Sequence, residues 1–423
     1  MSEAHGRITV HFPGPPESLR QTLVILDQHS RQRIQQIGGK LGPVGFREIE
    51  CQDFDFRERD HGKDHFPNSP SDQAAFLMLG KPTGRPQFTR MFDEARYDGR
   101  MPYRRCGDSG LLLPAISLGC WHNFGGVDDF EEGRRILRRA FDRGVTHFDL
   151  ANNYGPPPGS AEENVGRILV SDFVCHRDEL VISTKAGHDM WNGPYGMNGS
   201  RKHLLASLDQ SLKRLRLSHV DIFYSHCPDP DTRLEETMSA LATAVQSGRA
   251  IYAGLSKYPL KRLRKAVRIL KDMGVRCLIY QPPYSILQRR YEAEGIIDWL
   301  AEEGIGNIVF SPLAQGMLTP KCLDGIPEDS RAARPEGFLT TAQVLARHEK
   351  IRALGDLAAA HGMPLHHLAI RWALRSPKVT SALIGARTVS QLDDTLDALE
   401  GPAPDKALLE AIDAIAPAGW SPD

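Results

Sequence analysis

The feature that most constrains the fold is a regular alternation of short apolar segments and amphipathic segments between residues 116 and 399. The short apolar segments predict buried strands, and apolar residues spaced three and four apart between them predict helices. The alternation contains eight predicted strands. Eight strand and helix units are the number that closes a parallel (β/α)8 barrel, or TIM barrel, so the sequence predicts an α/β fold of this class.

The predicted elements follow one another without a segment that would divide them into two domains. A hairpin with its turn at residues 107–110 is expected before the first strand, where it would cover the barrel floor. The predicted strands are residues 116–119, 146–149, 180–185, 220–224, 250–255, 277–280, 307–310 and 381–384. The predicted helices are residues 128–143, 161–170, 200–215, 234–247, 260–273, 296–303, 341–361, 364–375 and 390–399.

Residues 1–95 differ in composition from the remainder of the chain. Gln, Arg, Asp, His and Pro are frequent there, and the apolar segments are short and isolated. We expect an N-terminal extension that is poorly ordered or forms a small appendage, followed by the barrel domain in residues 96–423. A third interpretation is that translation starts near Met91 or Met101.

The composition excludes some classes of partner. The chain has 423 residues, 41% of them hydrophobic and 25% charged, and its net charge is -1. This balance lacks the basic excess of a nucleic-acid-binding protein. No stretch reaches the length of about 18 apolar residues that a membrane span needs, and no signal peptide is recognisable. We expect a cytoplasmic protein whose partner is a small molecule; a homo-oligomer is compatible with the sequence.

The cysteines and histidines indicate no metal site. The seven cysteines are scattered and include no Cys-x-x-Cys motif, so neither a disulfide framework nor a zinc site is predicted. His61 and His65 are four residues apart, but Gly62 and Pro67 argue against a helix that would present them together. We expect no bound metal.

Three successive predicted strands end in side chains that can take part in proton transfer. They are Asp149, Lys185 and His226, and Tyr154 lies on the loop after the first of them. The carboxyl ends of barrel strands lie at one face, so these four side chains should converge. A helix cap, a packed aromatic ring, an ion pair or a loop histidine would explain each residue singly, but not the four together.

This combination suits the reduction of an aldehyde by hydride transfer. Tyr154 would supply the proton, and the ammonium of Lys185 would lower the phenol pKa from its usual value of about 10. Asp149 would hold Lys185, and His226 would donate a hydrogen bond to the developing oxyanion. A Cys227 thiol with His226 as its base is an alternative, but adjacent residues of an extended strand point to opposite faces.

The last predicted strand supplies a candidate phosphate site. No Gly-x-Gly-x-x-Gly motif follows a strand, which disfavours a two-domain dinucleotide fold. Instead, Leu-Ile-Gly-Ala-Arg-Thr leads into a helix, so backbone N–H groups and Arg387 could bind a phosphate. Arg387 favours the 2'-phosphate of NADP over NAD; the alternative is an ordinary surface arginine at a helix start.

Several motifs in this order resemble those of the aldo-keto reductase superfamily, from about Tyr97 to the C-terminus. They are Phe-Asp-Leu-Ala-Asn-Asn-Tyr-Gly, Ser-Thr-Lys, Tyr-Ser-His, Gly-Leu-Ser, Tyr-Gln-Pro-Pro-Tyr, Ser-Pro-Leu-Ala-Gln-Gly and Leu-Ile-Gly-Ala-Arg. The segments Trp-His-Asn-Phe-Gly, Asn-Asn-Tyr-Gly-Pro-Pro-Pro-Gly-Ser and Met-Trp-Asn-Gly-Pro-Tyr-Gly are most similar to bacterial L-glyceraldehyde 3-phosphate reductases. That branch is related to the potassium-channel β subunits.

The resemblance implies an NADPH-dependent reductase that converts small aldehydes to alcohols. It implies L-glyceraldehyde 3-phosphate or methylglyoxal as substrates, and a catalytic tetrad of Asp149, Tyr154, Lys185 and His226. Alternatives are an NADPH-binding regulatory protein resembling the channel β subunits and an alcohol dehydrogenase working in the oxidative direction. The implied cofactor-binding residues are Trp121, Asp149, Tyr154, Ser256, Gln281, Ser311, Leu313, Gln315, Lys321, Arg387 and Gln391.

Some positions leave details of binding open or depart from the family pattern. The resemblance implies that Tyr280 or Tyr284 stacks on the nicotinamide, and that Gln281 binds its carboxamide. Lys257 stands where the superfamily usually has Asn, which puts amide recognition there in doubt. Thr395 replaces an Asn that commonly contacts the adenine. The loops that carry Trp121 and Trp191 would wall a small substrate pocket.

Overall fold

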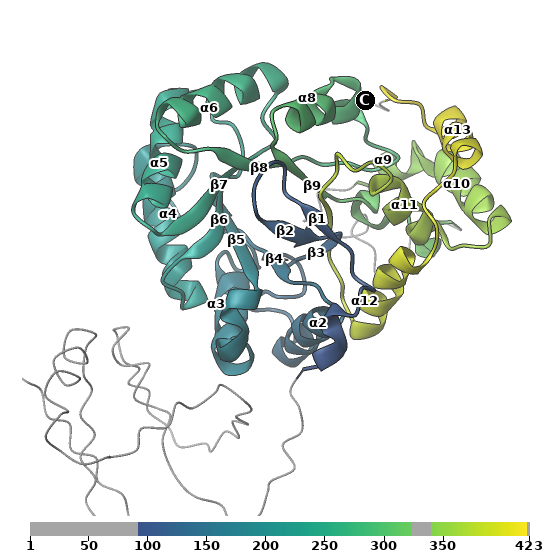
Figure 1. The fold of residues 1–423 in the computed structure, drawn as a ribbon, viewed down its shortest axis with the longest axis horizontal. Helices are drawn as coiled ribbons and strands as arrows, with labels where there is room; N and C mark the ends of the chain where they lie inside the picture. Colours follow the sequence, from purple (N-terminus) through teal and green to yellow (C-terminus); the bar gives the residue numbers. More distant parts are fainter. Residues whose placement is uncertain (1–91, 324–339, 421–423) are drawn as a thin grey trace, which may run out of the picture. The chain divides into compact units, whose positions relative to one another are not determined.

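A computed structural model describes residues 92–323 and 340–420 of the protein (Figure 1). The predictions for residues 1–91, which include the extension and the pair His61 and His65, lie outside the described residues. So does part of the long loop between residues 311 and 340.

Eight parallel strands close into a barrel in the order β10-β3-β4-β5-β6-β7-β8-β9, as Figure 1 shows. Each predicted strand is confirmed to within one residue at either end, and so is the TIM-barrel fold. The strands are β3 (Ile116–Gly119), β4 (His147–Asp149), β5 (Val181–Ala186), β6 (Val220–Ser225), β7 (Ala250–Ser256), β8 (Cys277–Gln281), β9 (Gly306–Phe310) and β10 (Ser381–Ile384).

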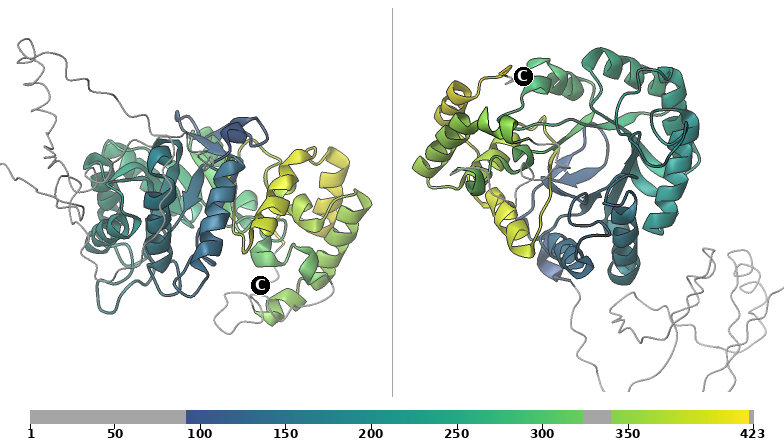
Figure 2. Two further views of the ribbon diagram at one scale, coloured as in Figure 1. Left: turned by 90° about the horizontal axis from the view of Figure 1, so that it is seen from below. Right: turned by 180° about the vertical axis from the view of Figure 1, so that it is seen from behind.

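The helices surround the barrel (Figure 2). They are α2 (Phe130–Asp142), α3 (Ser160–Asp172), α4 (Arg201–Leu215), α5 (Leu234–Gln246), α6 (Leu260–Asp272), α7 (Arg290–Ala293), α8 (Ile296–Glu302), α9 (Thr341–Leu345), α10 (His348–Ala360), α11 (Leu365–Ala373), α12 (Val389–Leu396) and α13 (Lys406–Ile415).

The prediction of one helix over residues 341–361 is wrong. The chain forms α9 and α10 there. Where α9 ends, the guanidinium of Arg347 donates a hydrogen bond to the Gln343 carbonyl at 2.8 Å. Helices α7 and α13 were not predicted from the sequence. The signal for α13 was present, because Asp405 caps its start and Leu408 and Ile412, four residues apart, are its buried side chains.

The predicted hairpin is formed by β1 (Tyr103–Arg105) and β2 (Leu112–Pro114), which pair antiparallel. Its turn lies against the start of β9, where the Asp108 backbone N–H donates to the Gly304 carbonyl at 2.9 Å. A side chain at Gly306 would place Cβ only 2.2 Å from Cys106 Sγ. The hairpin therefore covers the amino end of the barrel, as Figure 1 shows, and the opposite end remains for chemistry.

The barrel interior has an apolar layer and a polar layer. Alternate residues of each strand face inward. The apolar layer consists of Val181, Ile222, Tyr224, Leu278, Ile279, Ile308 and Leu383, and it forms one cluster with Cys106 and Leu113 of the hairpin. The polar layer lies on β3, β4 and β5, and its buried side chains are Ser117, His147, Asp149, Ser183 and Lys185.

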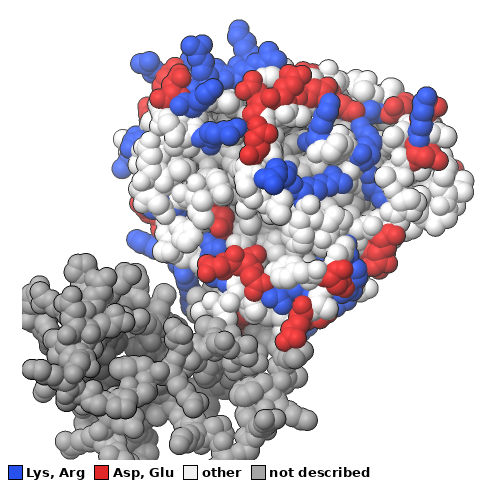
Figure 3. Space-filling model, viewed as in Figure 1, with Lys and Arg blue, Asp and Glu red and all other residues white. Residues whose placement is uncertain are grey.

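Charged side chains of both signs lie on the exterior of the described residues. On the face drawn in Figure 3, Lys and Arg side chains are interspersed with Asp and Glu rather than gathered by sign. Among residues 92–323 and 340–420, no helix is long and apolar enough to cross a membrane.

A buried ion pair joins β5 to two helices. Glu162 of α3 is fully buried and lies 2.7 Å from the guanidinium of Arg214 on α4. The hydroxyl of Thr184 on β5 donates to the same carboxylate at 2.5 Å. Because Thr184 precedes Lys185, this contact supports the strand that carries one of the candidate catalytic residues.

We predict that Arg214→Met lowers the free energy of unfolding by about 3–5 kcal/mol, because it leaves the Glu162 carboxylate buried without its partner. Urea denaturation measures the effect. The matched control is Arg249→Met, which removes a more exposed pair with Asp209 and should cost less than about 1 kcal/mol. Equal losses in the two variants would contradict the prediction.

Candidate active site

An ion pair between two neighbouring strands forms the centre of the site. Asp149 ends β4 and Lys185 lies on β5, and both side chains are fully buried. The ammonium of Lys185 pairs with Asp149 Oδ2 and donates to the Leu150 carbonyl at 2.7 Å. It also lies 3.3 Å from the hydroxyl of Tyr154. The structure thus brings three of the four predicted catalytic residues together.

The start of α3 fixes the backbone of Tyr154. The Tyr154 carbonyl accepts from the N–H groups of Gly159 at 3.0 Å and Ala161 at 3.3 Å. The Trp121 indole stacks on the Tyr154 ring at a centroid distance of 5.4 Å. Their two loops meet at Gly125, where a Cβ would lie 2.6 Å from the Pro156 carbonyl oxygen. Only glycine allows this approach, so the loop sequence favours the stacking.

His226 completes the group. Its ring meets the Tyr154 ring edge-on, with 5.9 Å between centroids. Burial lowers the pKa of His226 well below its usual range, so the imidazole is neutral near pH 7. Its Nδ1 has no hydrogen-bond partner within the described ranges. A neutral imidazole carries one N–H, which suits donation to a carbonyl oxygen.

The pKa of Tyr154 differs in direction from the sequence prediction. Burial raises the pKa of the phenol above its usual value because it disfavours the phenolate. The Lys185 ammonium has the expected opposing effect but does not overcome the desolvation. Tyr154 is therefore protonated before the reaction, as a proton donor must be.

A buried hydrogen-bonded chain that the sequence analysis missed leads to Asp149. The His147 ring lies between the hydroxyls of Ser117, at 2.9 Å, and Ser183, at 3.0 Å. Ser183 donates to Asp149 Oδ1 at 2.6 Å, and Ser117 contacts Ser381 at 2.7 Å. The only signal in the sequence was a polar residue at alternate positions of three strands.

The predicted cofactor-binding residues lie at the same end of the barrel. The Gln281 amide donates to Asp149 Oδ1 at 3.2 Å, and the Ser256 hydroxyl donates to the Gln281 carbonyl at 2.8 Å. The backbone N–H of Arg387 donates to the Gln391 side chain at 2.9 Å. Three of the predicted residues end strands: Asp149 ends β4, Ser256 ends β7 and Gln281 ends β8. The loops after the strands carry Trp121 after β3, Tyr154 after β4, Arg387 after β10, and Ser311, Leu313, Gln315 and Lys321 after β9. Gln391 lies on α12.

The loop after β9 has a backbone that turns sharply. Ser311, Ala314 and Gln315 have φ values of 55°, 48° and 59°, a region that non-glycine residues seldom adopt. Such values are concentrated at ligand-binding segments. The loop begins where β9 ends, so its first residues lie at the same barrel end as Gln281. This geometry fits a group that lies across the loop.

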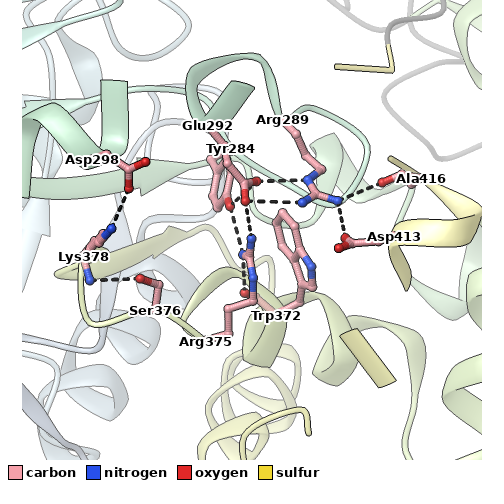
Figure 4. Close-up of polar contacts among 10 residues, drawn as sticks. All are labelled: Tyr284, Arg289, Glu292, Asp298, Trp372, Arg375, Ser376, Lys378, Asp413 and Ala416. Atoms are coloured by element: carbon pink, nitrogen blue, oxygen red, sulfur yellow. Dashed lines mark hydrogen bonds and ion pairs between the residues drawn. The ribbon is translucent and has the colours of Figure 1, made fainter. Parts of the chain in front are cut away.

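Neither tyrosine proposed to stack on the nicotinamide faces the barrel interior. Tyr280 is fully buried in the outer core, and its hydroxyl donates to the Tyr258 carbonyl at 2.7 Å. Tyr284 stacks on Trp372 at 4.9 Å, within the polar network shown in Figure 4. Both assignments are wrong. Phe310, partly buried at the end of β9, is the aromatic side chain that packs on the interior cluster there.

The structure also shows the surroundings of Cys227, Trp191 and Thr395, for which the sequence suggested roles. The pKa of the Cys227 thiol is raised by burial, and Sγ lies 3.8 Å from His188 Nδ1, which disfavours a thiolate nucleophile. Trp191 packs on His203, with 5.0 Å between ring centroids. The hydroxyl of Thr395 donates to the Gln391 carbonyl at 2.8 Å, so it is already engaged within α12.

A group with metal-ligand character lies on the outer helices. Among the described residues, potential ligand atoms of His366, His367 and Asp394 lie within 4.8 Å of one another. His366 and His367 start α11, and Asp394 belongs to α12. The group is separate from the tetrad, whose side chains lie at the barrel ends of β4 to β6.

The buried His147 gives the protein a pH-dependent stability. Burial lowers the pKa of His147 to about 4, whereas an exposed histidine titrates near 6.5. Between these values the unfolded chain binds a proton that the folded chain does not, so this contribution to stability is complete above pH 6.5 and is lost as the pH falls toward 4.

We predict that His147 alone makes the protein about 2 kcal/mol less stable at pH 5 than at pH 7.5. Urea denaturation of wild type and His147→Phe at both pH values measures this contribution, because the variant lacks the titrating group. The two proteins should differ in pH dependence by that amount. Identical dependence on pH would show that the pKa of His147 is the same in the folded and unfolded states.

Comparisons with known proteins agree with the fold. Residues 115–416 match the model of the aldo/keto reductase family. The L-glyceraldehyde 3-phosphate reductase of Escherichia coli (strain K12) is 55% identical over 305 residues, which are 71% of this chain and 88% of that protein. A probable voltage-gated potassium channel subunit beta of Oryza sativa subsp. japonica is 33% identical over 306 residues, 71% and 92% of the two chains.

A solved structure shares the fold. It is an aldo-keto reductase from Bacillus halodurans in its holo form, with a TM-score of 0.63 and 24% sequence identity over 76% of this chain and 98% of that one. At this identity the match shows the fold alone. Together with the family match and the 55% identity, it leads to one conclusion: this chain belongs to the aldo/keto reductase family and is an oxidoreductase.

Proposed function

We propose that this protein reduces small aldehydes to alcohols with NADPH, and that L-glyceraldehyde 3-phosphate and methylglyoxal are its substrates. The observation that carries the proposal is the position of the Lys185 ammonium between Asp149 and the Tyr154 hydroxyl. The reductase from E. coli, 55% identical, supports the phosphorylated substrate by its name. The free cysteines of the described residues fit a reducing cytoplasm.

The four side chains have distinct roles in this proposal. Bound NADPH supplies a hydride to the carbonyl carbon. Tyr154 gives its proton to the carbonyl oxygen, and the Lys185 ammonium stabilises the phenolate that remains. Asp149 keeps Lys185 charged and oriented. His226, neutral and at the edge of the Tyr154 ring, donates a hydrogen bond to the oxygen while its negative charge develops.

The cofactor would be held by residues from four loops. The Gln281 amide and the Ser256 hydroxyl would bind the nicotinamide carboxamide, and residues 311–321 would lie along the pyrophosphate. Arg387 and Gln391 would bind the adenosine end, at the start of α12, where backbone N–H groups favour an anion. The fit rests on donors already present at one barrel end and on the turned backbone after β9.

We predict that Tyr154→Phe lowers kcat for methylglyoxal by about 10²- to 10⁴-fold, because the variant has no proton to donate. NADPH oxidation, followed by absorbance, measures the rate. Fluorescence titration with NADPH is the control for folding and should still show cofactor binding, because Phe keeps the aromatic ring. A variant that keeps the wild-type rate would show that the proton comes from another group.

We predict that Arg387→Ala raises the Kd for NADPH about ten- to a hundred-fold and leaves the Kd for NADH unchanged, because only NADPH has a 2'-phosphate. Fluorescence titration with each cofactor measures both values. An equal loss for the two cofactors would place Arg387 at a group that they share.

The regulatory alternative rests on relatives named as potassium channel β subunits, one of them 33% identical. Tight NADPH binding with negligible turnover of both aldehydes would favour that function over catalysis. Turnover of the alcohols with NADP, measured in the opposite direction at cellular cofactor ratios, separates a reductase from an alcohol dehydrogenase.

A further inference from the structure

A lysine that has no role in the proposed tetrad lies beside it. Lys257 follows the last residue of β7, and its φ of 62° turns the chain there. Its ammonium donates to His188 Nε2 at 2.8 Å. The His188 ring in turn meets the His226 ring edge-on, with 4.3 Å between centroids. One imidazole ring therefore separates the Lys257 ammonium from a candidate catalytic residue.

The charge of Lys257 is uncompensated in the described part of the chain. Residues 92–323 and 340–420 place no carboxylate within ion-pair distance of its ammonium. The Lys185 ammonium repels the Lys257 ammonium and lowers its pKa, but Asp149 already neutralises Lys185. His188 adds no countercharge, because burial lowers its pKa to about 4 and the ring is neutral.

Partial burial makes this arrangement unfavourable without an anion. Burial lowers the pKa of Lys257, which shows that desolvation of the ammonium is not balanced by its surroundings. An anion beside the ammonium would supply the missing partner and a charge-assisted hydrogen bond. The Lys257 ammonium contacts the His188 ring, which packs on the His226 ring of the tetrad.

We propose that Lys257 forms an anion subsite that binds the phosphate of short phosphorylated aldehydes while their carbonyl group lies at Tyr154 and His226. This inference rests on the proposed function and names the substrate class that the site selects. Since the phosphate is remote from the reacting carbonyl, its contact with Lys257 is the same before and during hydride transfer. Such a contact lowers KM and leaves kcat unchanged.

The test compares Lys257→Met with wild type on L-glyceraldehyde 3-phosphate and on methylglyoxal, which has no phosphate. The ratio of kcat/KM for the first substrate to that for the second should fall about ten- to a hundred-fold, through KM. The control is Lys271→Met, which removes the same charge from the exposed end of α6 and should leave the ratio unchanged. An unchanged ratio in Lys257→Met overturns the proposal, and a raised Kd for NADPH with that result would assign Lys257 to the cofactor.

A second measurement separates this proposal from the proposed function. Inorganic phosphate is titrated into the full-length protein at saturating NADPH, so that the cofactor's own phosphate sites are filled. The Tm of the wild-type complex should rise with phosphate concentration, and that of Lys257→Met should not. If neither aldehyde were a substrate, the reductase proposal would be wrong, but the rise in Tm with phosphate would be unaffected. An equal rise in Tm in both proteins would overturn the subsite.

Discussion

The buried pair of Asp149 and Lys185 is the interaction on which the active site depends. Two charges removed from water are costly unless further hydrogen bonds satisfy them. Asp149 accepts from the Lys185 ammonium, the Ser183 hydroxyl and the Gln281 amide, and Lys185 also donates to the Leu150 carbonyl. The partners of this pair come from β5, from β8 and from the residue after β4, so only the closed barrel brings them together.

The division of the barrel into layers follows from this requirement. The hairpin and the apolar layer fill the amino end, where Cys106 and Ile308 belong to one cluster. The polar layer above them needs a residue that can link hydroxyl groups without adding charge. His147 meets this need because its imidazole is neutral and offers one donor and one acceptor to Ser117 and Ser183. The layer thereby orients Asp149 through the Ser183 hydroxyl, which donates to Oδ1 while Lys185 pairs with Oδ2.

The strands could be predicted from the alternation of apolar and amphipathic segments. The convergence of the tetrad could be predicted because the carboxyl ends of barrel strands lie at one face. Side chains alternate in direction along a strand: Gln281 faces inward to Asp149, so Tyr280 must face outward. The assignment of Tyr280 to the nicotinamide neglected that alternation. The pKa direction of Tyr154 could not be predicted, because burial depends on residues distant in sequence. Nor could the break before α10, which depends on the contact of Arg347 with a backbone carbonyl.

The contacts around β7 and β8 link the residues proposed to bind the cofactor with the residue proposed to bind the substrate phosphate. Gln281 bonds to Asp149, and Ser256 bonds to the carbonyl of Gln281. Lys257 is the next residue in the chain and contacts His188, which packs on His226. The proposed carboxamide and anion contacts thus occupy consecutive positions on one loop. Because Ser256 and Lys257 are adjacent in the chain, a shift of this backbone on binding one ligand also moves the contact with the other, so binding of the cofactor and of the anionic substrate should be coupled.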